Sequence, residues 1–508
     1  MKIAAIRTHR LYNPILLGSA LLILIIAHCM NIVNNSGTSS DSEIRRFAAL
    51  QLKKNPDELT DKDITEITEL SMGQDITPSE KLRDIKPLQK YVNLQELNLV
   101  NLRYHVRDIP KWQSYLGKIG IIDLSKKPGF DLSPLAKLSK LRRLKIDRTP
   151  VNDIKPLAGL TKLESLTLTS SYVRISDIKP LAGLTKLESL DLHSAFISDI
   201  EPLADLAKLE TLNLSDTKIA DFSLLAGFTN LVSLNLSNTY FYDFTLLASL
   251  SKLESLDLTG TKISDSKLLV SLPNLESLNL SRTPISDLKL LAGLPKLKSL
   301  DLTGTKISDI KLLASLQNLE TLNLSYTQIS DIKLLASLPN LESLDLEKTQ
   351  ISDFEPLKEL TNLHKLSLYV TEISDLEPIS GLTNLQKLDI GQTKISNLEL
   401  LRELTNLQEL YIDSTPVTNL EPIKGLTNLR KLDIGGTRVS DIEPLRELTN
   451  LQELSINNIP VTNLEPIKGL TNLRKLSLVL IDITYEQRKE LEKALPNLKI
   501  QNSEWGIR

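Results

Sequence analysis

The sequence contains few of the residues that build a large irregular core. Aromatic residues make up only 4% of its 508 residues, and leucine and isoleucine dominate the apolar fraction. A chain of this length is too long for one ordinary core. The shortage of large side chains therefore favours thin repeated layers over a single compact core.

Cysteine is almost absent, since Cys29 is the only one, and no disulfide can form within the chain. Neither sign of charge predominates, because the formal net charge is only −3. Residues 1–40 hold three of the 60 basic residues and none of the 63 acidic ones, so the rest of the chain is mildly acidic. Nucleic-acid phosphates call for clustered lysine and arginine, so we expect no nucleic-acid partner.

Residue patterns typical of enzymes are also missing. Beyond the N-terminal apolar segment the histidines are His105, His193 and His364, with no cysteine or second histidine at metal-ligand spacing. No glycine-rich phosphate loop and no nucleophile elbow is present. We expect no catalytic residue, no metal, no cofactor and no small-molecule substrate.

Long apolar runs are absent apart from one near the N-terminus. Residues 13–33 carry no charge and are long enough to cross a bilayer of ~30 Å as a helix. Basic residues precede this run and the first acids follow it, which predicts a cytoplasmic N-terminus and an exported remainder. We divide the region into a basic segment (1–12), a transmembrane signal anchor or signal peptide (13–33) and a linker (34–40).

Three fates are open for residues 13–33. A retained signal anchor leaves a single-pass protein of the cytoplasmic membrane, with the rest of the chain outside the cytoplasm. A cleaved signal peptide releases a secreted protein. In the third alternative, residues 26–29 are a degenerate lipoprotein signal and Cys29 is lipidated, although His28 stands where that processing needs a small residue.

The main feature of the sequence is the recurring phrase L-x-x-L-x-L. It begins at Leu94, Ile119, Leu141, Leu163 and Leu187, and then every 22 residues from Leu209 to Leu473, in eighteen repeats. A weaker copy begins at Ile67. Counting from the first leucine of a unit, apolar residues occupy positions 1, 4, 6, 11, 14, 17 and 20 of residues 297–318.

These positions predict one strand and one return segment in each unit. Positions 4 and 6 alternate as in a half-buried strand, and positions 14, 17 and 20 step by three as in a short 3₁₀ helix. No unit can bury its own apolar residues, so neighbouring units must stack. We predict nineteen parallel strands on the concave face of a curved solenoid.

The repeats, such as LTNLQKLDIGQTKISNLELLREL at residues 382–404, resemble the 22-residue leucine-rich repeats of bacterial internalins. The resemblance implies an α/β-class leucine-rich-repeat solenoid that is monomeric and not an enzyme. It also implies a module for recognition or adhesion that binds a protein partner along its concave face. Two alternatives remain: an extracytoplasmic scaffold or envelope-polymer binder without one specific ligand, and a regulatory subunit, which the export signal opposes.

Two polar columns in the repeats look structural. Position 9 is threonine in twelve units, where the related family usually has asparagine, and we predict an inward hydroxyl ladder that bonds the turns of adjacent coils. Position 13 is usually aspartate, followed in several units by proline at position 16. This pattern predicts caps of the return helices, because capping needs one oxygen whereas Ca²⁺ needs six to eight.

Both ends of the solenoid look capped. Residues 41–93 form an N-terminal helical cap with the first degenerate repeat, including a helix over 41–56 and a capping box of Thr60 and Asp63. Residues 94–483 are the repeats. Residues 484–508 form a C-terminal cap helix and tail with Thr484 and Gln487 as a second capping box, and Leu498 and Ile500 resemble a last strand.

The partner is expected where the concave positions depart from the usual polar residues. The candidate patch lies within five consecutive repeats and consists of Tyr326, Glu347, Lys348, His364, Tyr369 and Tyr411. Tyrosine is favoured at interfaces because it joins a large apolar body to a polar tip. The alternatives are repeat drift, since single exposed aromatics need no explanation, and a second site at residues 103–120.

Overall fold

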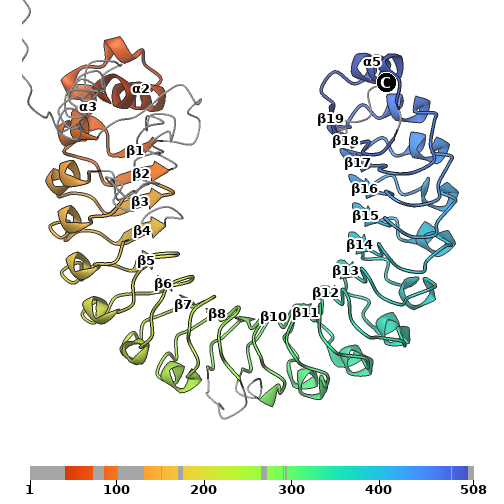
Figure 1. The fold of residues 1–508 in the computed structure, drawn as a ribbon, viewed down its shortest axis with the longest axis horizontal. Helices are drawn as coiled ribbons and strands as arrows, with labels where there is room; N and C mark the ends of the chain where they lie inside the picture. The colour runs from red at the N-terminus through yellow and green to blue at the C-terminus, as the bar shows by residue number, and fades with distance from the viewer. Residues whose placement is uncertain are drawn as a thin grey trace, which may run out of the picture.

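The computed structural model describes residues 40–72, 85–100, 131–149, 151–169, 175–264, 272–289, 291, 294–481 and 483–501. In this part of the chain, strands and short 3₁₀ helices alternate along a horseshoe (Figure 1). Residues 13–33, Cys29 and residues 103–120 lie outside the described residues. None of the helices in the described ranges is both long and apolar enough to span a membrane.

The strands are β1 (Glu69–Met72), β2 (Glu96–Val100), β3 (Arg143–Asp147), β4 (Ser165–Thr169), β5 (Ser189–Asp191), β6 (Thr211–Asn213), β7 (Ser233–Asn235), β8 (Ser255–Asp257), β9 (Ser277–Asn279), β10 (Ser299–Asp301), β11 (Thr321–Asn323), β12 (Ser343–Asp345), β13 (Lys365–Ser367), β14 (Lys387–Asp389), β15 (Glu409–Tyr411), β16 (Lys431–Asp433), β17 (Glu453–Ser455), β18 (Lys475–Ser477) and β19 (Lys499–Gln501). The α-helices are α2 (Ser40–Leu52), α3 (Asp61–Glu66) and α5 (Tyr485–Ala494). The 3₁₀ helices are η1 (Pro56–Glu58), η2 (Lys86–Lys90), η4 (Ser133–Lys137), η5 (Lys155–Leu157), η6 (Lys179–Leu181), η7 (Glu201–Leu203), η8 (Ser223–Gly227), η9 (Phe244–Leu247), η11 (Lys311–Ser315), η12 (Lys333–Ser337), η13 (Glu355–Glu359), η14 (Glu377–Ile379), η15 (Glu399–Glu403), η16 (Glu421–Ile423), η17 (Glu443–Glu447) and η18 (Glu465–Gly469).

All strands of the described residues belong to one parallel sheet in which each strand pairs with its neighbour along the chain. The register is constant: Leu300 lies beside Leu278 on one side and Leu322 on the other. The strands line the inner face of the horseshoe and the 3₁₀ helices its outer face (Figure 1). The predicted solenoid with a concave parallel sheet is confirmed.

Strand β2 pairs with β1 along one edge and with β3 along the other. The strand predicted from the repeat at Ile119 falls on residues outside the described ranges. The predicted last strand near Ile500 is present as β19.

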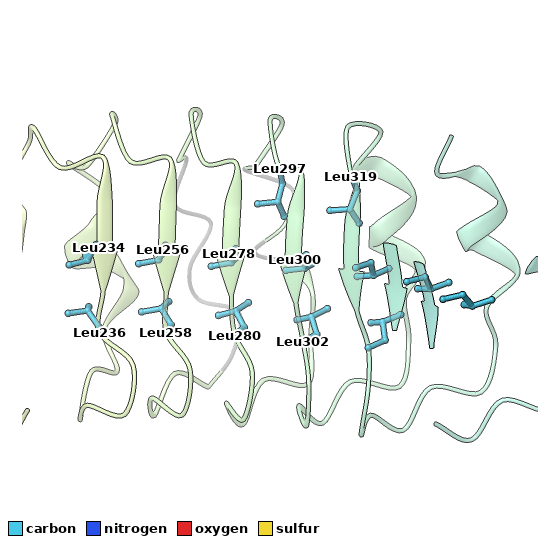
Figure 2. Packing of buried hydrophobic residues seen from close by; sticks show 14 of the residues in the cluster. Leu234, Leu236, Leu256, Leu258, Leu278, Leu280, Leu297, Leu300, Leu302 and Leu319 are labelled. Carbon is cyan, nitrogen blue, oxygen red and sulfur yellow. The ribbon is translucent and has the colours of Figure 1, made fainter. Parts of the chain in front are cut away.

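The core is a stack of leucine layers. Positions 4 and 6 of successive units point inward and lie over one another, as Leu256 and Leu258 lie beside Leu278 and Leu280 (Figure 2). These leucines are at most 1% exposed. Each fully buried leucine contributes about 1.5–3 kcal/mol relative to an exposed one, and each needs the neighbouring coil to cover it.

The threonine ladder is inward, as predicted, but most of its members bond within their own coil. The Thr261 hydroxyl is buried and donates to the carbonyl of Leu258 in its own coil at 2.7 Å, and Thr305 does the same with Leu302. Thr149 also reaches the preceding coil, where its hydroxyl lies 3.4 Å from the Leu99 carbonyl. The coils are also joined by asparagine at position 22, whose amide donates to the preceding coil, as Asn318 does to the Pro295 carbonyl at 3.0 Å.

The aspartate column stabilises the start of the return helices, as predicted, but from one residue before the N-cap, which is Ile310 in η11 and Leu398 in η15. The Asp309 carboxylate accepts the backbone N–H of Lys311 at 2.9 Å, and Asn397 accepts that of Glu399 at 2.9 Å. Among the described residues no three His, Cys, Asp or Glu side chains are grouped to hold a metal ion.

The two end caps contain the predicted capping boxes. The Thr60 hydroxyl accepts the Asp63 N–H at the start of α3, and the Thr484 hydroxyl accepts the Gln487 N–H at the start of α5, each at 3.2 Å. Helix α2 ends at Leu52, so it is shorter than the predicted helix over 41–56.

Candidate functional site

The concave face is polar because positions 3, 5 and 7 stand on the side of the sheet opposite to the buried positions 4 and 6. At position 5 in ten repeats, an aspartate or asparagine oxygen accepts the N–H of position 7, as Asp301 does with Thr303 at 2.9 Å. Many of the acids on the concave face are therefore bonded to the backbone of their own coil, and this role was not predicted from the sequence.

The first part of the predicted patch is a group of three side chains. The Tyr326 hydroxyl donates to the Glu347 carboxylate at 2.7 Å, which raises the pKa of the tyrosine. The Lys348 ammonium lies 5.1 Å from the centre of the Tyr326 ring, within the range of a cation–π contact. Tyr326 is still 50% exposed, so this group offers a ring edge to a ligand.

Tyr369 lies in the repeat after that of Lys348, and its ring packs over a glycine. Gln392 donates its amide to the Tyr369 hydroxyl. A Cβ at Gly391 would lie 3.0 Å from the Tyr369 ring and 2.5 Å from the Asp413 carboxylate. The glycine thus provides the room in which the ring and the carboxylate lie side by side.

Tyr411 is held by charged neighbours. Its hydroxyl donates to Glu409 at 3.1 Å, and the Lys387 ammonium lies 5.3 Å from its ring centre. Lys431 forms an ion pair with the same Glu409 at 2.9 Å. Burial, together with the Glu409 charge, raises the pKa of Tyr411, so its hydroxyl remains a donor.

Asp389 lies between these tyrosines. Its neighbours across the sheet are Ser367 and Tyr411, and its carboxylate accepts the Gly391 N–H at 3.0 Å. Burial, with a smaller effect from the charge of Asp413, raises the pKa of Asp389 to about 6. Near neutral pH this part of the face holds a poorly solvated negative charge, which favours ligands with N–H donors or positive charge.

His364 is not part of this arrangement. It lies at position 2, before the strand, and its side chain is half-buried. Its Nδ1 atom is buried and has no hydrogen-bond partner within the described part of the chain. Five of the six predicted residues therefore take part in the contacts on the concave face, and His364 takes no part in them.

A shallow hollow of about 310 Å³ adjoins Tyr411 toward the C-terminal end of the sheet. It exists because position 5 carries the small residues Ser455 and Ser477 after the large Tyr411. Its charge is mixed, because the lining includes Lys431 and Lys475 as well as Asp433 and Glu453. The hollow extends the polar surface beside the patch.

Sequence analysis missed a polar group around His193. Its Nδ1 lies 2.8 Å from the Ser215 hydroxyl and 3.5 Å from the Asp216 carboxylate, and its Nε2 lies 3.2 Å from the Ser194 hydroxyl. The backbone N–H of Ser194 donates to Ser215 and that of His193 to Asp191, so neither is left to bind an oxyanion. The arrangement stabilises a turn and does not assemble an acyl-transfer site. No spacing in the sequence signals it, because its members come from adjacent coils.

The analysis also missed three exposed aromatic side chains, namely Phe196, Tyr240 and Tyr242, which are 40%, 62% and 68% exposed. They occupy positions 10 and 12, outside the concave strand. Position 12 is otherwise small or polar in the 22-residue units, for example Ser308 and Ser330. That departure was visible in the sequence, but only concave positions were searched.

Comparison with known proteins supports the repeat class. Residues 273–315, 317–359, 361–403 and 405–447 match the family of Leucine Rich repeats (2 copies). No curated protein matches the sequence.

Several solved structures are similar to this chain. One is an internalin (InlF) of Listeria monocytogenes, with 25% identity over 83% of this chain and 98% of its own and a TM-score of 0.40. A leucine-rich repeat protein of Leptospira interrogans has 21% identity over 87% of this chain and 97% of its own, with a TM-score of 0.53. The ectodomain of the plant receptor kinase GASSHO1/SCHENGEN3 of Arabidopsis thaliana, in complex with CASPARIAN STRIP INTEGRITY FACTOR 2, has 19% identity over 82% of this chain and 54% of its own, with a TM-score of 0.54.

The described part of the chain has the leucine-rich repeat fold, and the four matched segments within residues 273–447 carry repeats of that family. Proteins of this class are generally interaction modules. The sheet, the caps and the ladders all serve to hold a long polar face in one curved arrangement.

Proposed function

We propose that this protein is a non-enzymatic recognition or adhesion module that binds a protein partner along its concave face. The single observation that carries the proposal is the surface formed by β15 and the turns after β11 and β13, where Tyr326, Tyr369 and Tyr411 lie beside carboxylates. Tyrosine rings with positioned polar groups are typical of residues that dominate protein interfaces.

The contacts within this surface support a preorganised binding site. Tyr326, Tyr369 and Tyr411 are already oriented by Glu347, Gln392 and Glu409. Less side-chain entropy is then lost when a partner binds. The raised pKa of Asp389 supports a partner that presents N–H donors or positive charge to this surface.

We further propose that residues 13–33 hold the protein in the cytoplasmic membrane with its repeats outside the cytoplasm. The support is the uncharged run itself and the basic residues before it. Fractionation of the producing cells tests this. Recovery of the protein in soluble form with a shortened N-terminus would contradict an anchor and support secretion.

The binding proposal is tested by capturing partners on the purified full-length chain. We expect one stoichiometric protein, lost when Tyr369→Ala and Tyr411→Ala are combined. Tyr485→Ala serves as the matched control, because Tyr485 is 58% exposed on α5, outside the concave face. Retention of the partner by the double variant would contradict the proposed surface, and capture of envelope polymer without protein would favour a scaffold role.

A further inference from the structure

A second exposed surface lies on the flank of the horseshoe, where each coil leaves the sheet. Position 11 of each unit is buried there, while positions 10 and 12 point to solvent, as buried Phe241 lies between exposed Tyr240 and Tyr242. Backbone hydrogen bonds align the coils at this edge: the Lys218 N–H donates to the Ile197 carbonyl and the Lys262 N–H to the Phe241 carbonyl. Residues at position 10 therefore form a row.

Among the described residues, the aromatic side chains at position 10 are Phe196 and Tyr240. The same position holds lysine, arginine, proline, glutamine or glutamate in the other units that begin from Leu209 to Leu451. Tyr240 and Tyr242 are the most exposed aromatic side chains of the described residues, and neither has a hydrogen-bond or ring partner there. Large exposed rings without a structural task indicate an interaction surface.

The charge around this row identifies the kind of partner. Residues 187–262 hold eleven aspartates and glutamates and four lysines, two of which, Lys218 and Lys262, stand on either side of Tyr240 in the row. Asp221, one coil before Tyr242, is exposed, and its capping hydrogen bond from the Ser223 N–H lowers its pKa, so it stays negative at physiological pH. This environment repels polyanions such as nucleic acids and attracts cations.

The row already contains one cation–π contact. The Lys218 ammonium lies 5.2 Å from the centre of the Phe196 ring. A lysine or arginine of a partner would meet the Tyr240 and Tyr242 rings in the same way, and the Asp221 carboxylate of the preceding coil would attract its charge.

We propose that Phe196, Tyr240 and Tyr242, with Asp221, form a second interaction surface that binds a lysine- or arginine-rich segment of a protein. The surface lies outside the concave face, so it adds a second contact site to the one proposed above. Two sites on one rigid scaffold allow a partner to bind at both, or two partners to be joined.

The test uses the full-length chain and a fluorescein-labelled hexa-arginine peptide, followed by fluorescence anisotropy. Combining Tyr240→Ser with Tyr242→Ser is expected to weaken binding about tenfold, and Asp221→Asn to weaken it severalfold. Tyr485→Ser is the matched control, because Tyr485 is 58% exposed on α5, outside both the concave face and this flank. It should leave the affinity unchanged.

Three results would overturn the inference. The first is unchanged affinity in the double serine variant. The second is an equal loss in Tyr485→Ser, which would show diffuse attraction to an acidic protein. The third is equally tight binding of a hexa-glutamate peptide. Serine is found at position 12 of other units and Tyr240 is mostly exposed, so the variants should fold, and a denaturation curve checks that they do. Loss of the concave partner by Tyr369→Ala leaves this result untouched, so the two proposals fail separately.

Discussion

The tyrosines of the concave face and those of the flank differ in what surrounds them. On the concave face, Tyr369 and Tyr411 are half-buried and their hydroxyls are engaged by Gln392 and Glu409. On the flank, Tyr240 and Tyr242 project into solvent without such contacts. The concave tyrosines thus belong partly to the scaffold, whereas the flank tyrosines make no such contacts with the described residues, which supports the binding role proposed for them.

This contrast predicts that the two regions respond differently to mutation. Changes in the contacts of the concave tyrosines should alter both stability and binding. Changes in the flank tyrosines should alter binding alone. Phe241, which lies between them in the sequence, belongs instead to the buried core.

The largest effect is expected at that residue. Phe241 is fully buried and meets Phe222 edge-on, with ring centres 5.3 Å apart. Phe241→Ala should lower the free energy of unfolding by about 3–5 kcal/mol, because it removes a buried ring and leaves a cavity. Urea denaturation measures this, and a loss below about 1 kcal/mol would mean that the flank repacks freely.

Gly391→Ala should have the next largest effect. The new methyl group would approach the Asp413 carboxylate and the Tyr369 ring too closely, so one of them must move. We expect a loss of about 1–2 kcal/mol, in the range of mild overpacking, and greater reactivity of Tyr369 toward nitration, read by mass spectrometry.

Gly381→Ala is the control for this change, because no heavy atom outside its immediate neighbours lies within 4 Å of the position of its added Cβ. It should be neutral. Equal stability of the two alanine variants would show that the packing of Tyr369 against Gly391 is not required.

Asp389→Asn should stabilise the protein at pH 7. The pKa of Asp389 is raised from 3.8 to about 6 in the folded state, so the folded protein binds the proton more tightly than the unfolded chain. Stability contributed by this group is therefore present below about pH 4 and is lost as the pH rises through about 6. Asparagine can still accept the Gly391 N–H, as Asn323 accepts that of Ser325 in its own unit.

We expect a gain of about 1 kcal/mol at pH 7, discounted for partial exposure, and no gain at pH 4. Unfolding curves at the two pH values measure it. A gain of the same size at both pH values would show that burial does not destabilise the charged form of Asp389.

The smallest effect is expected for Tyr240→Ser combined with Tyr242→Ser. Both rings are mostly in water, so the free energy of unfolding should change by no more than about 0.5 kcal/mol. Thermal unfolding provides the measurement. A larger loss would place these rings in the scaffold and remove the contrast between the two regions.

Much of the fold was predictable because each unit repeats the same local solution. The spacing of Leu300 and Leu302 predicted the strand β10. The spacing of Ile310, Leu313 and Leu316 predicted the return segment that contains η11. The role of Asp309 at the start of η11 was recognisable because its hydrogen bond spans only two residues.

Interactions between coils were predicted less well. Thr261 was expected to bridge two coils, but it bonds within one, and Asn318 makes the bridge instead. Spacing along the chain does not show which atoms come within reach 22 residues later.

The candidate site shows the same limit. The tyrosines at 326, 369 and 411 could be located because they interrupt a regular pattern. Their partners could not be assigned, since Gln392 and Tyr369 are 23 residues apart and meet only across two stacked coils.

The sequence alone therefore specifies the unit: its strand, its return, its caps and the side of each residue, because these follow from contacts between residues close in the chain. The stacking of units is what places Tyr369 over Gly391 and leaves Tyr242 in solvent. Exposure and hydrogen bonding at these positions arise from neighbouring coils, so only the three-dimensional structure separates the tyrosines held by the scaffold from those free to bind.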